Sequence, residues 1–277
     1  MFPVAVGLSF RPAWLDSLLA LPGRGPIDVL EVMVDDALHC ADTLKLFRRL
    51  GARWPLLGHG VALGIGNADG LDCGYLAAIS EILAHLHVRW YGDHLCFLTA
   101  GDYELGHFAP VGADHDSLAA LEVNGAEVRR TVTVPFLLEN PADVLGWGAE
   151  SPNAGARLGR EFGACIEAAD AGAILDVTNL LYGSRNDGFN AEAFIAAMPL
   201  ERLVQVHLAG GRQIRGLWID SHDRPIEPDS MALLEVVLRD SPNLRAVTLE
   251  WDEDLPEFEV ALAAVDRVRS VVREAGR

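Results

Sequence analysis

The stretch TVPFLLENP, residues 133–141, joins an apolar run to a carboxylate, an amide and a proline. Its first part, from Thr133 to Leu138, is typical of a short strand that is buried on both faces, as in a parallel sheet. Glu139 and Asn140 follow directly at the end of this strand. Because charged side chains are rarely buried without a partner, we ask whether other strands of the chain end in the same way.

Short apolar runs alternate with longer segments of helical periodicity along the chain. The expected strands are 4–9, 27–33, 55–60, 89–95, 134–140, 172–178, 203–209 and 246–252. The expected helices are 12–21, 41–51, 72–87, 116–131, 155–171, 190–198, 229–240 and 257–275. Asp72 and Asn190 are expected to cap two of them, and Pro256 stands where the first turn of the last could start. This alternation predicts a parallel sheet covered by helices. The longer segments 97–116 and 210–229 are expected to be loops, where function tends to lie.

About eight strand–helix units, with no obvious linker between them, fit the (β/α)8 barrel among the α/β folds. We predict a single (β/α)8 TIM barrel in one domain over residues 1–277. A doubly wound open sheet is the alternative. The sequence has neither a GxGxxG motif after the first strand nor a P-loop, which such sheets often carry.

The amino-acid composition limits the kinds of molecule that this protein is expected to bind. The net charge is −18, from 40 acidic and 22 basic residues, and Lys45 is the single lysine. Such a chain repels nucleic acid and anionic membranes, so we expect neither as a partner. The four cysteines, Cys40, Cys73, Cys96 and Cys165, form no CxxC pair, and no signal peptide or membrane-length apolar run is evident. We therefore expect reduced thiols and a cytoplasmic location.

From the third expected strand onward, every strand ends in an imidazole or a carboxylate. The six residues are His59, His94, Glu139, Asp176, His207 and Glu250. In a TIM barrel the carboxyl ends of all strands lie at one face, so these side chains are expected to converge there. Three further residues are close in the sequence: Asn179 follows Asp176 by three positions, and Asp220 and His222 flank Ser221.

These side chains are metal ligands of the hard and borderline kind, with no thiolate among them. The set is larger than one metal ion needs, and its carboxylates would repel one another strongly without cations. The sequence therefore predicts two or three metal ions, with Glu139 and Glu250 as candidates for bridging ligands. The composition of the set suits Mn, Fe or Zn.

A purely structural interpretation competes at each single position. A lone histidine at a strand end is more often a hydrogen-bonded core residue, and Asp176 alone is explained by capping the next helix. Six such residues on consecutive strands favour metal binding, because helix caps rarely use histidine. The remaining histidines, His39, His85, His87, His107 and His115, are expected at the surface or in packing roles, and Cys96 in packing.

At these residues the sequence resembles the multinuclear non-haem iron-dependent oxidases that modify peptides. This family, long known only as a domain of unknown function, contains the methanobactin-biosynthesis oxidase. The matching motifs, in the family's order, are GHGVALGIGNADGLD (58–72), DHL (93–95), LLENP (137–141), LDVTN (175–179), GFNAEAFIAAMPLERLVQVHLAG (188–210), IDSHDRPI (219–226) and LEWD (249–252). The resemblance covers essentially the whole chain.

The resemblance implies a xylose-isomerase-like TIM barrel that carries two or three Fe ions. It assigns a first metal to His59, His94 and Glu139. A second metal shares Glu139 and adds Asp176, His207 and Glu250, and a third takes Asp220 and His222, with Asn179 facing it. Glu139, Asp176, Asn179 and His222 are the residues expected to serve catalysis.

The implied reaction is the oxidation of a cysteine, or sometimes of another residue, in a ribosomally synthesised precursor peptide. Mixed-valent Fe2+/Fe3+ would carry it out with O2 as co-substrate. A small peptide-recognition partner protein is expected, since the chain ends soon after its last helix, and a leader peptide would pair with a strand edge. A Zn or Mn hydrolase or sugar isomerase on the same barrel is the alternative, and a non-catalytic metal-binding protein is the third hypothesis.

The sequence departs from the family pattern at three places. The usual E-x-H-x-E-N is Glu31-Val32-Met33-Val34-Asp35-Asp36, so that a histidine is replaced by Met33. The usual HLAGH ends in Gly211, and an H-N-H-G run is Arg185-Asn186-Asp187-Gly188. None of these changes removes an expected ligand, but they bear on the substrate.

Overall fold

The computed structural model describes residues 3–141 and 153–277. Eight parallel strands form a closed barrel in the order β1-β12-β9-β8-β7-β4-β3-β2, which confirms the predicted TIM barrel. The barrel strands are β1 (Ala5–Ser9), β2 (Val29–Met33), β3 (Leu56–His59), β4 (Tyr91–His94), β7 (Phe136–Glu139), β8 (Gly172–Asp176), β9 (Leu203–Leu208) and β12 (Ala246–Leu249). Each of them lies inside one of the eight predicted strand ranges.

Internal contacts divide the chain into two compact units. The first consists of Met1–Glu31, Ala142–Gly159 and Leu175–Arg277, and the second of Val32–Pro141 and Arg160–Ile174. We refer to them as unit 1 and unit 2. That the whole chain acts as a single domain stays a prediction.

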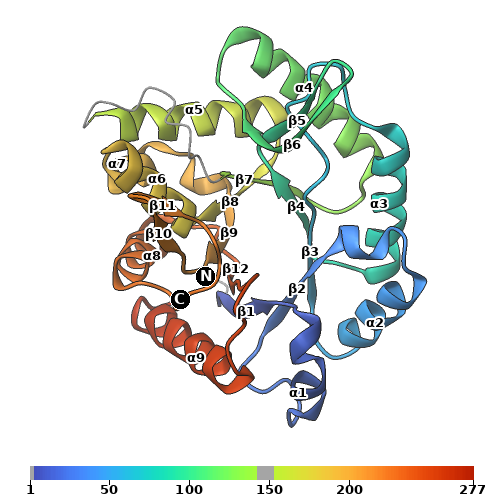
Figure 1. The fold of residues 1–277 in the computed structure, drawn as a ribbon, viewed down its shortest axis with the longest axis vertical. Coiled ribbons are helices and arrows are strands. Elements are labelled where there is room, and N and C mark those ends of the chain that lie inside the picture. Colours follow the sequence, from blue (N-terminus) through green and yellow to red (C-terminus); the bar gives the residue numbers. More distant parts are fainter. Residues whose placement is uncertain (1–2, 142–152) are drawn as a thin grey trace. The chain divides into compact units, whose positions relative to one another are not determined.

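Unit 2 contains helices α2 (Ala41–Gly51), α3 (Cys73–Leu86) and α4 (His115–Thr131), and most of α5 (Ala154–Ala169). Helix α3 contacts both α2 and α4 (Figure 1). Its start agrees with the prediction, because the carboxylate of Asp72 accepts hydrogen bonds from the backbone N–H groups of Gly74 and Tyr75. The short 3-10 helix η2 (Val34–Ala37) follows β2.

The prediction of a loop over residues 97–116 is wrong for most of this segment. The segment contains an antiparallel hairpin of β5 (Cys96–Ala100) and β6 (Tyr103–Pro110). The reversal is made at Gly101-Asp102, where Gly101 has a φ of 59°. A glycine followed by an aspartate between two extended runs indicates a hairpin. The glycines of this segment instead led to its interpretation as a loop.

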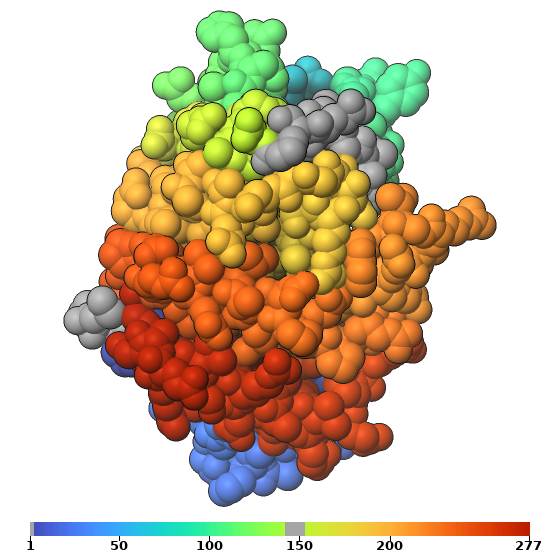
Figure 2. Space-filling view, turned by 90° about the vertical axis from the view of Figure 1, so that its left-hand side faces the viewer, coloured from blue at the N-terminus to red at the C-terminus, as the bar shows by residue number. Residues whose placement is uncertain are grey.

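Unit 1 contains α6 (Val177–Asp187), α7 (Ala191–Ala197), α8 (Pro228–Asp240) and α9 (Phe258–Glu274). It also has α1 (Leu15–Ala20) and the 3-10 helices η1 (Pro12–Trp14) and η3 (Leu200–Arg202). Helices α8 and α9 contact each other, and their orange and red surfaces adjoin in Figure 2. Asn190 caps α7 as predicted, with Oδ1 accepting from the N–H of Ala193, whereas α9 starts two residues after Pro256.

The sequence prediction missed α6 because the strand before it was drawn too long, to residue 178. Strand β8 ends at Asp176, whose Oδ1 accepts the N–H of Asn179 at 2.7 Å and starts the helix. Gly188, with a φ of 76°, ends it. The predicted loop 210–229 likewise contains a hairpin of β10 (Arg212–Ile214) and β11 (Leu217–Ile219).

Among the described residues, no helix combines the length and the apolar character that crossing a membrane requires. All four cysteines are free thiols, with Cys40 and Cys73 exposed and Cys96 and Cys165 buried.

Candidate metal centre

Three strand ends of unit 2 bring two imidazoles and a carboxylate together. His59 ends β3, His94 ends β4 and Glu139 ends β7. One ligand atom from each lies within 4.8 Å of the others. Glu139 Oε2 is 3.2 Å from His59 Nε2 and 3.8 Å from His94 Nε2. We call this set the unit 2 triad.

The register of the strands explains why these side chains meet. His94 pairs with Glu139 across β4 and β7, and His59 pairs with Gly92 across β3 and β4. A Cβ atom at Gly92 would lie 2.4 Å from Ile174 Cδ1 and 3.1 Å from His59 Nδ1, so only glycine leaves room for this imidazole. The ring of His94 also stacks on Phe108 of β6, with centroids 4.3 Å apart.

A buried tyrosine–aspartate chain lies directly behind the triad. Tyr91 donates its hydroxyl to Asp93 Oδ2 at 2.7 Å, and the N–H of His94 donates to Asp93 Oδ1 at 2.8 Å. Tyr75 donates to Asp35 Oδ1 at 2.8 Å, and Asp35 also accepts the N–H of Val61. Asp35, one of the departures from the family pattern, therefore has a structural partner in this chain.

Asp93 makes the stability of the metal-free protein depend on pH. Burial raises the pKa of Asp93 to about 7, although the Tyr91 hydroxyl and the charge of His59 act to lower it. The folded state therefore holds a proton between about pH 4 and pH 7 that the unfolded state has released, so stability must fall as pH rises through this window. We expect metal-free Asp93→Asn to lose less stability than wild type between pH 4 and 8.

The expected difference is up to about 4 kcal/mol in the free energy of unfolding, measured by urea denaturation at both pH values. Asp116→Asn, an exposed residue on α4, is the matched control. Identical pH profiles for wild type and Asp93→Asn would contradict a raised pKa at this position.

Unit 1 holds a second set, formed by Asp176 at the end of β8, His222, and Glu250 directly after β12. One ligand atom from each of these three lies within 4.8 Å of the others. Glu250 Oε2 is 3.8 Å from His222 Nδ1 and 3.6 Å from His207 Nδ1. We call Asp176, His222 and Glu250 the unit 1 triad, and His207 is its neighbour through Glu250.

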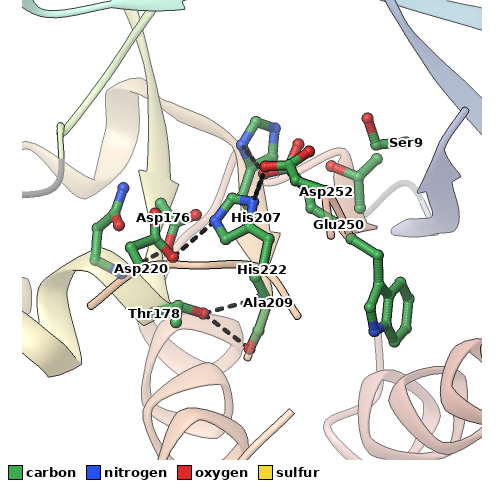
Figure 3. A network of polar contacts seen from close by, with 12 residues as sticks. Ser9, Asp176, Thr178, His207, Ala209, Asp220, His222, Glu250 and Asp252 are labelled. Carbon is green, nitrogen blue, oxygen red and sulfur yellow. Dashed lines mark hydrogen bonds and ion pairs between the residues drawn. The ribbon is translucent and has the colours of Figure 1, made fainter. Parts of the chain in front are cut away.

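His222 lies between two more carboxylates, as Figure 3 shows. Its Nε2 is 2.7 Å from Asp220 Oδ1, and its Nδ1 is 2.8 Å from Asp252 Oδ2. Burial acts to lower the pKa of His222, but these charges outweigh burial and raise the pKa well above its ordinary value. His222 also adopts a left-handed backbone, with a φ of 47°, and its carbonyl accepts the N–H of Asp252.

Asp252 in turn contacts Arg11, whose guanidinium also bonds the carbonyl of Trp251 and the hydroxyl of Ser9. Burial acts to raise the pKa of Asp252, but the hydrogen bond and charge of His222, with Arg11, lower it to about 2. Asp252 was not among the predicted site residues, although it belongs to the LEWD motif. Its aspartate–histidine contact is long-range in sequence, which is why spacing gave no signal.

Asp176 serves as a helix cap and as a member of the triad. Its Oδ1 caps α6, as the structural interpretation of this residue expected, and it also belongs to the metal-sized group. Asn179 is buried on the first turn of α6. The hydroxyl of Thr178 joins this turn to the backbone of Ala209 after β9 (Figure 3).

The β10–β11 hairpin, which leads into Asp220, is fixed to α6. Asn186 Nδ2 donates to the carbonyl of Trp218 at 2.9 Å, and the N–H of Trp218 donates to Asn186 Oδ1 at 2.8 Å. The guanidinium of Arg185 lies 4.3 Å from the Trp218 ring centroid, and the Tyr182 ring stacks on Trp218 at 5.3 Å. Arg185, which departs from the family pattern, and Asn186, which matches it, thus form one clamp on the hairpin.

Gly211, which also departs from the family pattern, is required by this clamp. Its N–H donates to the Tyr182 hydroxyl at 2.7 Å. A Cβ atom at Gly211 would lie 2.2 Å from the Ile219 carbonyl oxygen and 2.7 Å from Tyr182 Cε2. A histidine at this position does not fit this backbone, so its absence follows from the close approach of the hairpin.

Glu31 is a second residue that the sequence interpretation did not include in the site. It is 1% exposed and contacts His207, with Nε2 3.1 Å from its carboxylate. An acidic residue inside an otherwise apolar strand was the available signal. The histidines expected outside the site, His39, His85, His87, His107 and His115, are all exposed. Burial raises the pKa of the Cys96 thiol far above its ordinary value, which agrees with packing.

The sequence model of the RiPP precursor modification enzyme MbnB/TglH/ChrH matches residues 5–273 of this chain. The chain belongs to the MbnB/TglH/ChrH family. A UPF0276 protein of Caulobacter vibrioides (strain NA1000 / CB15N) is 30% identical to it, over 95% of this chain and 92% of the relative. The MbnB/TglH/ChrH family is one of enzymes, and the strand-end residues singled out above lie within the matched range.

Solved structures agree with the barrel of this MbnB/TglH/ChrH family member. Endonuclease IV from Thermus thermophilus has a TM-score of 0.60 at 18% identity, over 98% of this chain and 99% of that chain. A xylose isomerase domain protein from Planctomyces limnophilus has a TM-score of 0.61 at 12% identity, over 99% and 98%. At these identities the likeness shows the fold alone.

The two triads have the donor chemistry of a divalent metal site. Each offers buried or nearly buried imidazole nitrogens and carboxylate oxygens, without a thiolate. Such oxygen and nitrogen sets suit Mn, Fe or Zn rather than the soft ions that prefer cysteine. In this MbnB/TglH/ChrH family member, the side chains of each triad therefore fit a bound metal ion.

Proposed function

We propose that this protein is a multinuclear iron-dependent oxidase that uses O2 to modify a cysteine of a ribosomally synthesised precursor peptide. The observation that carries the proposal is the pair of histidine–carboxylate triads in a chain of the MbnB/TglH/ChrH family of RiPP precursor modification enzymes. Nitrogen and oxygen ligands of this kind hold iron in either of two oxidation states.

The candidate ligands would be shared among the iron ions as follows. His59, His94 and Glu139 would hold one iron, and Asp176, His207 and Glu250 would hold another. Asp220 and His222 would provide a place for a third ion, toward which Asn179 would face. Iron supplies the electron transfer that no side chain of either set can perform. The protein fixes the ligands and keeps a position open for substrate.

His94 marks the side from which a substrate would reach the unit 2 triad. Its side chain is 14% exposed, whereas those of His59 and Glu139 are 4% and 3% exposed. The Phe108 ring that stacks on His94 comes from the β5–β6 hairpin. Peptide contact with this hairpin would therefore bring a substrate side chain close to His94.

The peptide and its partner protein would bind through strand edges. The β5–β6 and β10–β11 hairpins are each two-stranded sheets, so each has outer edges whose backbone groups can pair with an added strand. Tyr103 on β6 is 76% exposed and offers an aromatic contact at such an edge. We expect the precursor peptide as substrate and a small peptide-recognition protein as partner.

Metal analysis tests the proposal directly. The protein is purified without oxygen from iron-supplemented cells, its metals are counted, and the same sample is examined by Mössbauer spectroscopy. Two or three irons per chain with a coupled mixed-valent pair, together with O2-dependent change of a cysteine-containing precursor, are expected. Zinc or manganese at that stoichiometry, with no activity after iron reconstitution, would instead favour the hydrolase or isomerase on this barrel.

A further inference from the structure

A buried polar layer lies behind His207 in unit 1. It consists of Glu31 on β2, Gln205 and His207 on β9, and Thr248 on β12, none of them more than 1% exposed. Gln205 precedes His207 by two residues and Thr248 precedes Glu250 by two. Each pair therefore points to the same side of its strand. His207 and Thr248 are register partners across β9 and β12.

Every member of this layer contacts the carboxylate of Glu31. Gln205 Nε2 donates to Glu31 Oε1 at 2.6 Å, and the Thr248 hydroxyl donates to Glu31 Oε2 at 3.1 Å. His207 Nε2 lies 3.1 Å from both oxygens of the same carboxylate. A buried carboxylate is costly unless such donors surround it, so Glu31 and its three neighbours form one connected set.

The donors around Glu31 favour one of the two tautomers of His207. Only the amide nitrogen of Gln205 can lie 2.6 Å from a carboxylate oxygen, since an amide oxygen there would be repelled. Its second hydrogen goes to Thr248 Oγ1 at 2.9 Å. With both amide hydrogens placed in this way, His207 Nε2, which lies 2.8 Å from the same amide nitrogen, is the third donor to Glu31.

The other ring nitrogen faces the candidate metal site. His207 Nδ1 lies 3.6 Å from Glu250 Oε2, a member of the unit 1 triad. With the proton on Nε2, the lone pair of Nδ1 points to the side of Glu250. Histidines that bind metals commonly donate their other N–H to a carboxylate, which fixes the tautomer and the orientation of the ring.

We infer that Glu31 is a positioning residue that holds His207 in the Nε2–H tautomer and presents Nδ1 to a metal ion beside Glu250. The inference rests on the proposed metal centre, but it requires neither iron nor O2. A merely structural role for Glu31 would stabilise the fold without selecting a tautomer. The competing arrangement places the proton on Nδ1, with Gln205 donating to Nε2.

Nitrogen NMR of the metal-free protein tests the tautomer itself. Two-bond correlations in 15N-histidine-labelled wild type separate the two tautomers, and the His207→Gln variant assigns the His207 signals. We expect wild type to show His207 with the proton on Nε2, and Glu31→Gln to lose this preference. An Nδ1–H tautomer in wild type, or an unchanged tautomer in Glu31→Gln, would overturn the inference.

Zinc affinity, measured with Zn2+ alone against a competing chelator, gives a second readout. We expect Glu31→Gln to bind the ion of the unit 1 triad about 10- to 100-fold more weakly. Ser230→Ala is the matched control, because Ser230 on α8 is a buried polar residue of unit 1 outside this layer, and its loss of affinity should be several-fold smaller. Equal losses in the two variants would overturn the inference. Wild type that binds no zinc or iron would overturn the metal centre as well, whereas a wrong tautomer in a metal-binding protein overturns this inference alone.

Discussion

Replacing His94 with alanine is expected to abolish the O2-dependent modification of the precursor peptide and to remove one metal ion per chain. His94 Nε2 lies 3.8 Å from Glu139 Oε2, and the ring stacks on Phe108, so alanine removes the nitrogen that this strand end offers to a metal. We expect the rate of modification to fall by at least about 1,000-fold, because the loss of a metal ligand removes the redox chemistry and not only a contact.

His85→Ala is the matched control for this variant, because His85 is an exposed histidine on α3. It should keep both the metal content and the rate of wild type. Metal content is measured by elemental analysis, and modification by the mass change of the peptide. A His94→Ala protein with full metal content and an unchanged rate would rule out the unit 2 triad as the site of the reaction.

Replacing Glu250 with glutamine is expected to empty the unit 1 set while the unit 2 triad keeps its metal. Glu250 Oε2 lies between His207 Nδ1, at 3.6 Å, and His222 Nδ1, at 3.8 Å. An amide in its place has no negative charge to offset the metal, so the affinity of this set should fall by at least about 100-fold. The modification rate should fall with it, since the proposed oxidase is multinuclear.

Glu253→Gln provides the control. Glu253 lies three residues further along the same segment, is 68% exposed, and pairs with Arg212 at 3.6 Å. The metal content, counted by elemental analysis, should drop in the Glu250 variant alone. If both variants keep every metal, Glu250 is no ligand, and the unit 1 set must be rebuilt without it.

The barrel and most of the candidate ligands are readable from the sequence, because each depends on a short-range pattern. A run such as Phe136–Glu139 indicates a buried strand and, at its end, a carboxylate. Parallel closure of the sheet then places such ends at one face. For the same reason the caps at Asp72 and Asn190 were found, since a cap needs only the next few residues.

The features that escaped the sequence depend on contacts between distant segments. Glu31 meets Gln205, 174 positions away, and Asp252 meets Arg11, 241 positions away. No spacing rule connects such residues. Helix α6 was missed for a different reason, because the expected strand was extended to residue 178, past Asp176, whose side chain caps the helix.

The clamp between α6 and the β10–β11 hairpin has a consequence for engineering. Asn186 and Arg185 grip the hairpin at Trp218, two residues before Asp220, whereas the turn at Arg215-Gly216 lies beyond the grip. The turn can therefore be exchanged or lengthened without shifting the base of the loop. Ile214 and Leu217 flank that turn and are 43% and 45% exposed. The hairpin thus combines an anchored stem with a tip outside the clamp, so an exchanged tip would leave Asp220 in place.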